Sequence, residues 1–241
     1  MQFNMFTSIA YLLVATVCTT SLGQGQESAA DSRELTPAAK PMDTPQHSNS
    51  KIRSVILAGG CFWCVESDME AAPGVIKVLS GYTGGRRKNP TYETYASSGH
   101  REAVMVVYDP EVITYQGLVE FWIKHIDPTN GRGSFKDKGK QYGPAVYFET
   151  DEEKELALKV VKAVEDANVF RKKLDVSVEP RAAFWPAEDY HQDYHAKNPD
   201  KYMLYRSQSG RDEFVRSHWG TSASQLQLPG AFPSQTAEQP K

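Results

Sequence analysis

The alternation of apolar and polar positions predicts a series of strands and helices between Lys51 and Gly220. Apolar runs rich in β-branched residues and bounded by Gly, Pro or Asp predict strands at Arg53–Ala58, Val75–Tyr82, Ala103–Tyr108, Ala145–Phe148 and Val176–Glu179. Helical spacing of the apolar positions predicts helices at Cys61–Ala71, Tyr115–Ile126 and Glu152–Asn168. Glu188–Lys197 and Tyr202–Trp219 are expected to be helical or irregular.

The order of these elements, β-α-β-β-α-β-α-β, predicts an α+β fold with a mixed or antiparallel sheet in a single domain. Two long loops, 83–101 and 127–143, interrupt the pattern. Loops of this length in a compact domain are usually functional or disordered. Both contain aromatic and carboxylate side chains, which favours a functional role.

The two ends of the chain lack this pattern. Residues 24–50 are polar, with almost no large apolar side chain, and predict a disordered linker. Residues 221–241 form a polar, Pro-containing segment that predicts a disordered tail. One domain is therefore expected over 51–220, an ordinary size for a single fold.

Residues 1–23 are typical of a secretory signal peptide. The apolar run Ile9–Cys18 is too short to span a bilayer comfortably, and a small-x-small cleavage site ends at Gly23. Residues 1–8 hold no Lys or Arg, so an uncleaved anchor or a wrongly assigned start codon is the alternative. A cleaved signal predicts a periplasmic or extracellular protein whose only cysteines are Cys61 and Cys64.

Composition excludes several classes of protein. The formal net charge of -3 gives no electrostatic reason to expect binding to nucleic acid or to an anionic membrane surface. The 3 cysteines are too few for a disulfide-stapled scaffold, and the chain is long enough to bury a core without one.

The pentapeptide Gly60-Cys61-Phe62-Trp63-Cys64 is the strongest chemical signal. It follows a predicted buried strand and opens a predicted helix, so Cys61 is expected among free backbone N–H groups at the positive end of the helix dipole. That position favours a thiolate and predicts a nucleophile. Cys64 lies about one helical turn away, close enough to form a disulfide with Cys61. At least one of Phe62 and Trp63 is expected to line a pocket.

The Cys61-x-x-Cys64 spacing has other interpretations. It is half of a zinc site, which would need two further ligands such as His191 and His195, spaced i, i+4. Haem attachment is excluded because Val65, rather than His, follows the second cysteine. A thioredoxin-like redox pair is the main alternative.

Four polar residues of the loops are candidates for site chemistry: Tyr92, Glu102, Asp137 and Tyr142. Each on its own is more simply a packing or solvent-facing side chain. A carboxyl held against apolar walls, however, has a raised pKa and can act as an acid. The segment 187–195, dense in polar aromatic residues, either borders the site or is a surface helix.

Taken together, these motifs give a resemblance that covers residues 54–220. The chain resembles the A-type methionine sulfoxide reductases (MsrA family, peptide-methionine (S)-S-oxide reductases). The resemblance rests on motifs in one order: Gly60-Cys61-Phe62-Trp63, Gly81-Tyr82-Thr83-Gly84-Gly85, Asn89-Pro90-Thr91-Tyr92, Gly99-His100-Arg101-Glu102, Val107-Tyr108-Asp109-Pro110, Phe121-Trp122, Asp127-Pro128, Asp137, Gln141-Tyr142, Ala187-Glu188 and His191-Gln192. The family fold that it implies is an α/β roll around a ferredoxin-like β-α-β-β unit.

The resemblance also implies roles for individual residues. Cys61 matches the nucleophile that attacks the sulfoxide sulfur, and Phe62 and Trp63 match the wall that holds the substrate methyl group. Glu102 is implied as the acid that protonates the departing oxygen. The hydroxyls of Tyr92 and Tyr142 are implied as donors to that oxygen, and Asp137 as a polar residue that lines the site.

The implied reaction leaves Cys61 as a sulfenic acid, which a second thiol converts to a disulfide that an external dithiol reduces. Many family members have Gly where this chain has Cys64, and keep a resolving cysteine in the carboxyl tail; a subgroup has one at the position of Lys136. The tail 221–241 contains no cysteine, so Cys64 is the candidate resolving thiol.

The resemblance therefore implies an enzyme that reduces methionine-S-sulfoxide, free or in oxidised proteins, and so repairs oxidative damage. It implies no bound cofactor, a thioredoxin-like reductant as partner, and a monomer. Two other functions are consistent with the residues alone. One is a thiol–disulfide exchange protein, and the other is a non-catalytic binding domain with a structural disulfide.

Overall fold

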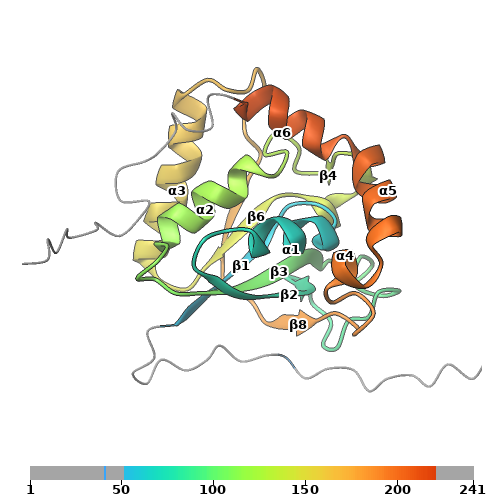
Figure 1. Ribbon diagram of the computed structural model, residues 1–241. Coiled ribbons are helices and arrows are strands. Elements are labelled where there is room, and N and C mark those ends of the chain that lie inside the picture. The colour runs from blue at the N-terminus through green and yellow to red at the C-terminus, as the bar shows by residue number, and fades with distance from the viewer. Residues whose placement is uncertain (1–40, 42–51, 221–241) are drawn as a thin grey trace, which may run out of the picture. The chain divides into compact units, whose positions relative to one another are not determined.

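The computed structural model describes Pro41 and residues 52–220 (Figure 1). The predicted signal segment, the tail and, apart from Pro41, the predicted linker lie outside the described residues. In the part of the chain that the structure describes, no helix has both the length and the apolar character needed to cross a membrane.

A six-stranded mixed sheet forms the centre of the described domain (Figure 1). Its order is β7-β6-β1-β3-β2-β8, and only the β6–β7 pair is parallel. The strands are β1 (Arg53–Ala58), β2 (Val75–Thr83), β3 (Arg101–Tyr108), β6 (Ala145–Phe148), β7 (Ser177–Pro180) and β8 (Phe184–Pro186). A separate two-stranded hairpin consists of β4 (Gly133–Ser134) and β5 (Asp137–Lys138).

Strand β1 is an inner strand of the sheet. Five of its six residues are buried, so both of its faces are covered. Val55 and Leu57 face one core, whereas Ile56 and Ala58 face a smaller apolar cluster on the other side. This alternation follows from the two-residue period of a strand. The strand ends directly before Gly59-Gly60, so the backbone that leads to Cys61 is anchored in the sheet.

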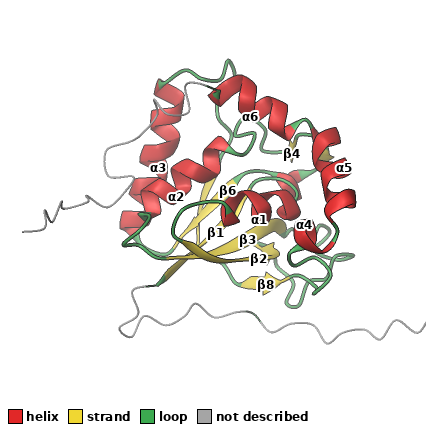
Figure 2. Ribbon diagram, viewed as in Figure 1, coloured by secondary structure: helices red, strands yellow, loops and turns green. Residues whose placement is uncertain are grey.

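Helices cover the face of the sheet that carries the larger core (Figure 2). Buried side chains of α1, α2 and α3, together with Trp219 of α6, pack against Val55 and Leu57 in one cluster. Burial of a large apolar side chain contributes about 1.5–3 kcal/mol. The helical elements are α1 (Phe62–Glu70), α2 (Tyr115–Lys124), the 3₁₀ turn η1 (Lys140–Tyr142), α3 (Asp151–Asp166), α4 (Tyr194–Lys197), α5 (Pro199–Ser209) and α6 (Arg211–Trp219).

The fold confirms the predicted α+β class, the single domain and the mixed sheet. The predicted β-α-β-β unit is the segment β1-α1-β2-β3. Strand β3 begins at Arg101 rather than Ala103, because Glu102 pairs with Tyr82 of β2. Glu102 is therefore inside the strand and buried.

Several elements were not predicted. Strand β8 is only three residues long and pairs with β2 at the edge of the sheet. No local pattern in the sequence predicts this pairing. The loop 127–143 contains the β4–β5 hairpin and η1. The C-terminal stretch divides into α4, α5 and α6, with the left-handed Gly210 between the last two helices.

Candidate active site

Cys61 is held at the junction of β1 and α1 by the Gly59-Gly60 turn. It is the N-cap residue of α1, with φ -51° and ψ 121°. Gly60 has φ +103°, and a Cβ atom there would lie 2.7 Å from Ser134 Oγ and 2.9 Å from Arg211 Nη2. Glycine is therefore required by both the backbone conformation and the packing.

Arg211 of α6 fixes this turn from the far end of the chain. Its side chain is 1% exposed, and Nη2 donates to the Gly59 carbonyl oxygen at 3.2 Å while Nη1 donates to the His125 carbonyl oxygen at 2.7 Å. Asp68 Oδ2, 3.6 Å from Nη1, balances the charge. No sequence signal pointed to Arg211, because a single arginine in a polar helix is ordinary.

Glu102 is the buried acid of the site. It is 3% exposed; its Oε2 accepts the Phe62 N–H at 3.0 Å, and its Oε1 accepts the Tyr95 hydroxyl at 2.8 Å. Desolvation raises the pKa of Glu102 to about 7, although both hydrogen bonds act in the opposite direction. At neutral pH the carboxyl is thus present in both protonation states, as a proton donor requires.

The two thiols do not divide their charge as the sequence led us to expect. Burial, a hydrogen bond to Cys64 and the charge of Glu102 raise the pKa of Cys61 well above its usual value. The hydrogen bond from Cys61 is the largest cause that lowers the pKa of Cys64 to about 7, and Arg211 and Arg206 contribute.

The prediction that the helix start favours a Cys61 thiolate is therefore wrong for the resting state. The physical reason is the burial of Cys61, followed by its hydrogen bond to Cys64 and the charge of Glu102. The first N–H of α1, that of Phe62, donates to Glu102. Both cysteines are free, and Cys61 is 7% exposed and Cys64 1% exposed. These shifts make the Cys61 S–H the donor, and the Cys64 sulfur the acceptor, of the hydrogen bond between the two thiols.

Phe62 and Trp63 divide between core and surface. Phe62 is 1% exposed and belongs to the main core. Trp63 is half-buried, and its indole stacks on Tyr194 with ring centroids 3.7 Å apart. Its Nε1 donates to His191 Nδ1 at 3.0 Å, and burial lowers the pKa of His191 to about 4, so that imidazole is a neutral acceptor.

The structure brings the predicted donors to the same region. Tyr92 is 43% exposed, and its ring lies 4.7 Å from that of His191 and 5.8 Å from that of Tyr95. The Tyr142 hydroxyl accepts from the Tyr95 hydroxyl at 3.3 Å. Asp137 acts on the pKa values of Glu102 and Tyr92, as expected for a residue that lines the site.

Two tyrosines of the site were missed. Tyr95 is 4% exposed and joins Glu102 to Tyr142. Tyr205 of α5 donates to Asp137 Oδ2 at 2.5 Å, and its hydroxyl also acts on Cys61, where it lowers the pKa of the thiol. The only available signal for Tyr95 was its position three residues after Tyr92 in the long loop 83–101. No signal in the sequence pointed to Tyr205.

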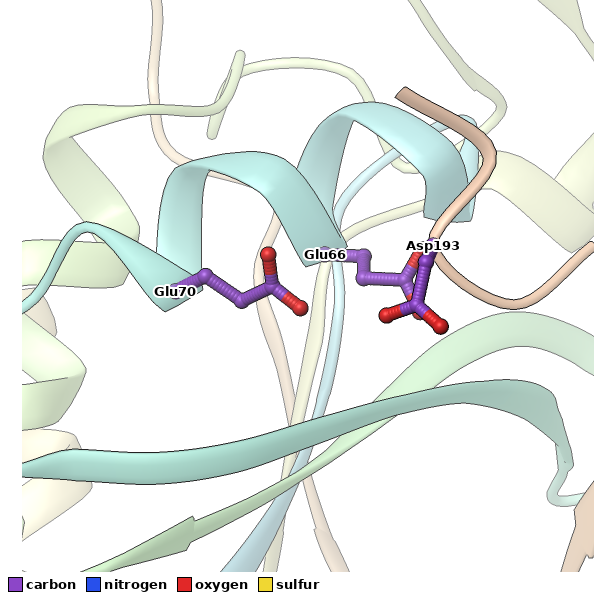
Figure 3. Close-up of side chains that lie close together, drawn as sticks. All are labelled: Glu66, Glu70 and Asp193. Carbon is purple, nitrogen blue, oxygen red and sulfur yellow. The ribbon is translucent and has the colours of Figure 1, made fainter. Parts of the chain in front are cut away.

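Two residues of α1 and the residue before α4 form a group of three carboxylates. Figure 3 shows Glu66, Glu70 and Asp193 turned toward one another, and ligand atoms of the three lie within 4.8 Å of each other. Glu70 lies 3.2 Å from His195 Nε2, Asp193 lies 3.5 Å from Lys197 Nζ, and burial raises the pKa of Glu66 to about 7. His195 and Lys197 therefore already contact two of the three carboxylates.

The zinc interpretation of Cys61 and Cys64 lacks the further ligands that it needs. Within 52–220, neither cysteine belongs to a cluster of three or more possible metal-ligating side chains. His195, one of the proposed ligands, pairs with Glu70, and His191 accepts from Trp63.

Comparisons with known proteins show the family of the chain. The family described as "Peptide methionine sulfoxide reductase" matches residues 53–223. The chain is 43% identical over 179 residues to "Peptide methionine sulfoxide reductase MsrA/MsrB" of Vibrio cholerae, covering 73% of this chain but only 47% of that longer relative. It is 44% identical over 166 residues to "Peptide methionine sulfoxide reductase MsrA" of Bacillus licheniformis, covering 68% of this chain and 92% of the relative.

Two solved structures share the fold. Methionine sulfoxide reductase A of Corynebacterium diphtheriae aligns with a TM-score of 0.55 and 29% identity over 63% of this chain and 77% of that one. The reduced form of Mxr1 from Saccharomyces cerevisiae aligns with a TM-score of 0.57 and 27% identity over 61% of this chain and 86% of that one. This chain therefore belongs to the peptide methionine sulfoxide reductase family.

Proposed function

We propose that this reductase acts on the S epimer of methionine sulfoxide, free or in oxidised proteins, with Cys61 as nucleophile and Glu102 as acid. The observation that carries the proposal is the buried carboxyl of Glu102, which contacts the N–H of the residue directly after Cys61 at 3.0 Å. An acid so close to the thiol is suited to a substrate that presents sulfur to one and oxygen to the other.

The first half of the reaction transfers oxygen from the substrate to the enzyme. Cys61 Sγ attacks the sulfoxide sulfur after passing its proton to the Cys64 sulfur. Glu102 protonates the sulfoxide oxygen, which allows the S–O bond to break. Tyr92 and Tyr142 donate hydrogen bonds to the oxygen. The hydroxyl group moves to Cys61 Sγ as the bond between the two sulfur atoms breaks, so methionine leaves and Cys61 is oxidised to the sulfenic acid.

The second half restores the thiols. Cys64 Sγ attacks the sulfenic sulfur of Cys61, the S–O bond breaks, and water leaves with formation of the Cys61–Cys64 disulfide. The proton that Cys64 received from Cys61 leaves in the water, and the charges of Arg211 and Arg206, which lower the pKa of Cys64, favour its thiolate in this step. A thioredoxin-like dithiol then reduces the disulfide by exchange.

Single turnover of the pre-reduced full-length protein, without reductant, tests the proposal. The S sulfoxide of a methionine peptide should give one equivalent of methionine and one intramolecular disulfide, and the R sulfoxide should give neither. Cys61→Ser should give no methionine. Cys64→Ser should give one equivalent, more slowly, and leave a sulfenic acid that a dimedone probe traps. Methionine from Cys61→Ser would refute the role of Cys61.

Glu102→Gln separates this function from thiol–disulfide exchange. Disulfide exchange has no oxygen to protonate, so its rate should be nearly unchanged in the variant. Sulfoxide reduction should fall by roughly 10²–10⁴-fold, the range for loss of a general acid. Equal losses in both assays would indicate a structural role for Glu102 instead.

We further propose that residues 1–23 direct export and are removed, and that the mature protein is a monomer. The support is the apolar run Ile9–Cys18 before the Ser21-Leu22-Gly23 site. Amino-terminal sequencing of protein secreted by an expression host should begin at Gln24. Retention of Met1 in a membrane fraction would favour an anchor. Light scattering of the mature protein measures its mass, which should be that of one chain.

A further inference from the structure

The buried hydroxyl of Tyr95 is a hydrogen-bonding group that the reaction above leaves unused. Its ring lies between two other tyrosines, with centroids 4.8 Å from Tyr82 and 5.8 Å from Tyr92. From there the hydroxyl reaches Glu102 Oε1 at 2.8 Å and the Tyr142 hydroxyl at 3.3 Å. Tyr95 therefore connects the acid of the site to one of its hydroxyl donors.

The two hydrogen bonds of Glu102 decide which oxygen can carry its proton. A backbone N–H can only donate, so Glu102 Oε2 must accept from Phe62 in both protonation states. The proton of the neutral acid is thereby directed to Oε1, the oxygen that faces Tyr95. A phenol can donate and accept at once, so Tyr95 can receive that proton while it donates to Tyr142.

We propose that Tyr95 is a positioning residue for the acid step, which fixes the proton of Glu102 on Oε1 and relays it to Tyr142. The proposal rests on the proposed function. In the step, Oε1–H gives its proton to the Tyr95 oxygen, Tyr95 gives its own to the Tyr142 oxygen, and Tyr142 gives its own to the sulfoxide oxygen. Glu102 ends as the carboxylate, and both tyrosines remain neutral.

The charges around Glu102 fit a relay through neutral groups. Burial raises the pKa values of Tyr95 and Tyr142 above the ordinary value, so neither phenol ionises near neutral pH. The titratable groups that face Glu102 come from β2, α1, the loop 83–100, β5 and η1: Tyr82, Cys61, Cys64, Tyr92, Tyr95, Asp137 and Tyr142.

Tyr95→Phe tests the hydrogen bond without an activity assay. The Tyr95 hydroxyl favours the charged form of Glu102, so its loss should raise the pKa of that carboxyl, by about one pH unit for a hydrogen bond to a charged group. The protonated-carboxyl band in the infrared spectrum, assigned by its loss in Glu102→Gln, gives the midpoint. A Cys64→Ser background removes the thiol that titrates in the same range. An unchanged midpoint overturns the proposal.

Single-turnover kinetics test the relay itself. Tyr95→Phe should slow methionine formation about tenfold with little change in substrate affinity, and should move the alkaline limb of the pH profile upward with the carboxyl midpoint. Because Tyr95 and Tyr142 act in series, the Tyr95→Phe/Tyr142→Phe double variant should be no slower than the slower single variant. Multiplicative losses, or a pH profile that does not move, overturn the relay.

Tyr108→Phe is the matched control. Tyr108 is fully buried in the same strand as Glu102, and its hydroxyl has no hydrogen-bond partner among the described residues. Its variant should keep the wild-type rate and midpoint. Failure of the wild type to reduce any sulfoxide would remove the proposed function, whereas the infrared midpoints would still decide the role of the Tyr95 hydroxyl.

Discussion

Glu102 should make the domain less stable at the pH at which it works. Burial raises its pKa from 4.5 to about 7, whereas the unfolded carboxyl ionises at the ordinary value. The folded state therefore binds more protons than the unfolded state between these values, and stability falls as the pH rises through the window. The shift corresponds to about 3 kcal/mol, at about 1.4 kcal/mol per unit.

Glu102→Gln removes this penalty because the amide has the shape of the acid and never ionises. Its oxygen can still accept the Phe62 N–H, and its NH₂ group can donate to the Tyr95 oxygen. Below pH 4.5 the wild-type carboxyl is neutral in both states, so the two proteins should be about equally stable. Above pH 7 the variant should be more stable by about 3 kcal/mol.

Urea unfolding of both reduced proteins at pH 4.5 and pH 8 measures the difference. In thermal unfolding of a domain of this size, the same difference of about 3 kcal/mol corresponds to a rise in Tm of roughly 6–12 °C at pH 8. Glu165→Gln, at an exposed helix position, controls for the loss of one negative charge and should show no such pH dependence. A pH-independent difference, or a variant less stable than wild type at pH 8, would refute the argument.

Three further substitutions test the residues that surround the two cysteines. Gly60→Ala should lower the free energy of unfolding by about 1–3 kcal/mol in urea, because Gly60 has φ +103° and a Cβ atom would lie 2.7 Å from Ser134 Oγ; unchanged stability would contradict this. Arg211→Met should raise the pKa of Cys64, followed by thiolate absorbance at 240 nm, and cost about 1–3 kcal/mol because the Gly59 carbonyl loses a donor. Tyr205→Phe should raise the pKa of Cys61 and slow single turnover several-fold, and a wild-type rate would exclude a role for its hydroxyl.

The first backbone N–H group of α1 contacts Glu102 rather than Cys61, and burial is the main cause of the raised pKa of both Glu102 and Cys61. Burial, the hydrogen bond to Cys64 and the charge of Glu102 raise the pKa of Cys61 and so favour its thiol form. The hydrogen bond from Cys61, together with Arg211 and Arg206, lowers the pKa of Cys64 to about 7 although Cys64 is only 1% exposed.

The sequence by itself determined the order of the longer elements and the position of the candidate nucleophile. Strand β1 and the Gly59-Gly60 turn are local features, because a short apolar run followed by two glycines has few other conformations. The helices α2 and α3 were also predictable, since apolar spacing and Thr caps act within one element. The resemblance then supplied the candidate roles of Glu102, Tyr92, Tyr142 and Asp137.

Only the tertiary structure decided how charge and protons are arranged around Cys61. Tyr95, Tyr205 and Arg211 reach the site from a loop and from two C-terminal helices, and their partners lie 7, 68 and 152 residues away along the chain. Burial raised the pKa values of both Cys61 and Glu102. Desolvation depends on every atom packed around a group, so no local pattern of residues can encode it.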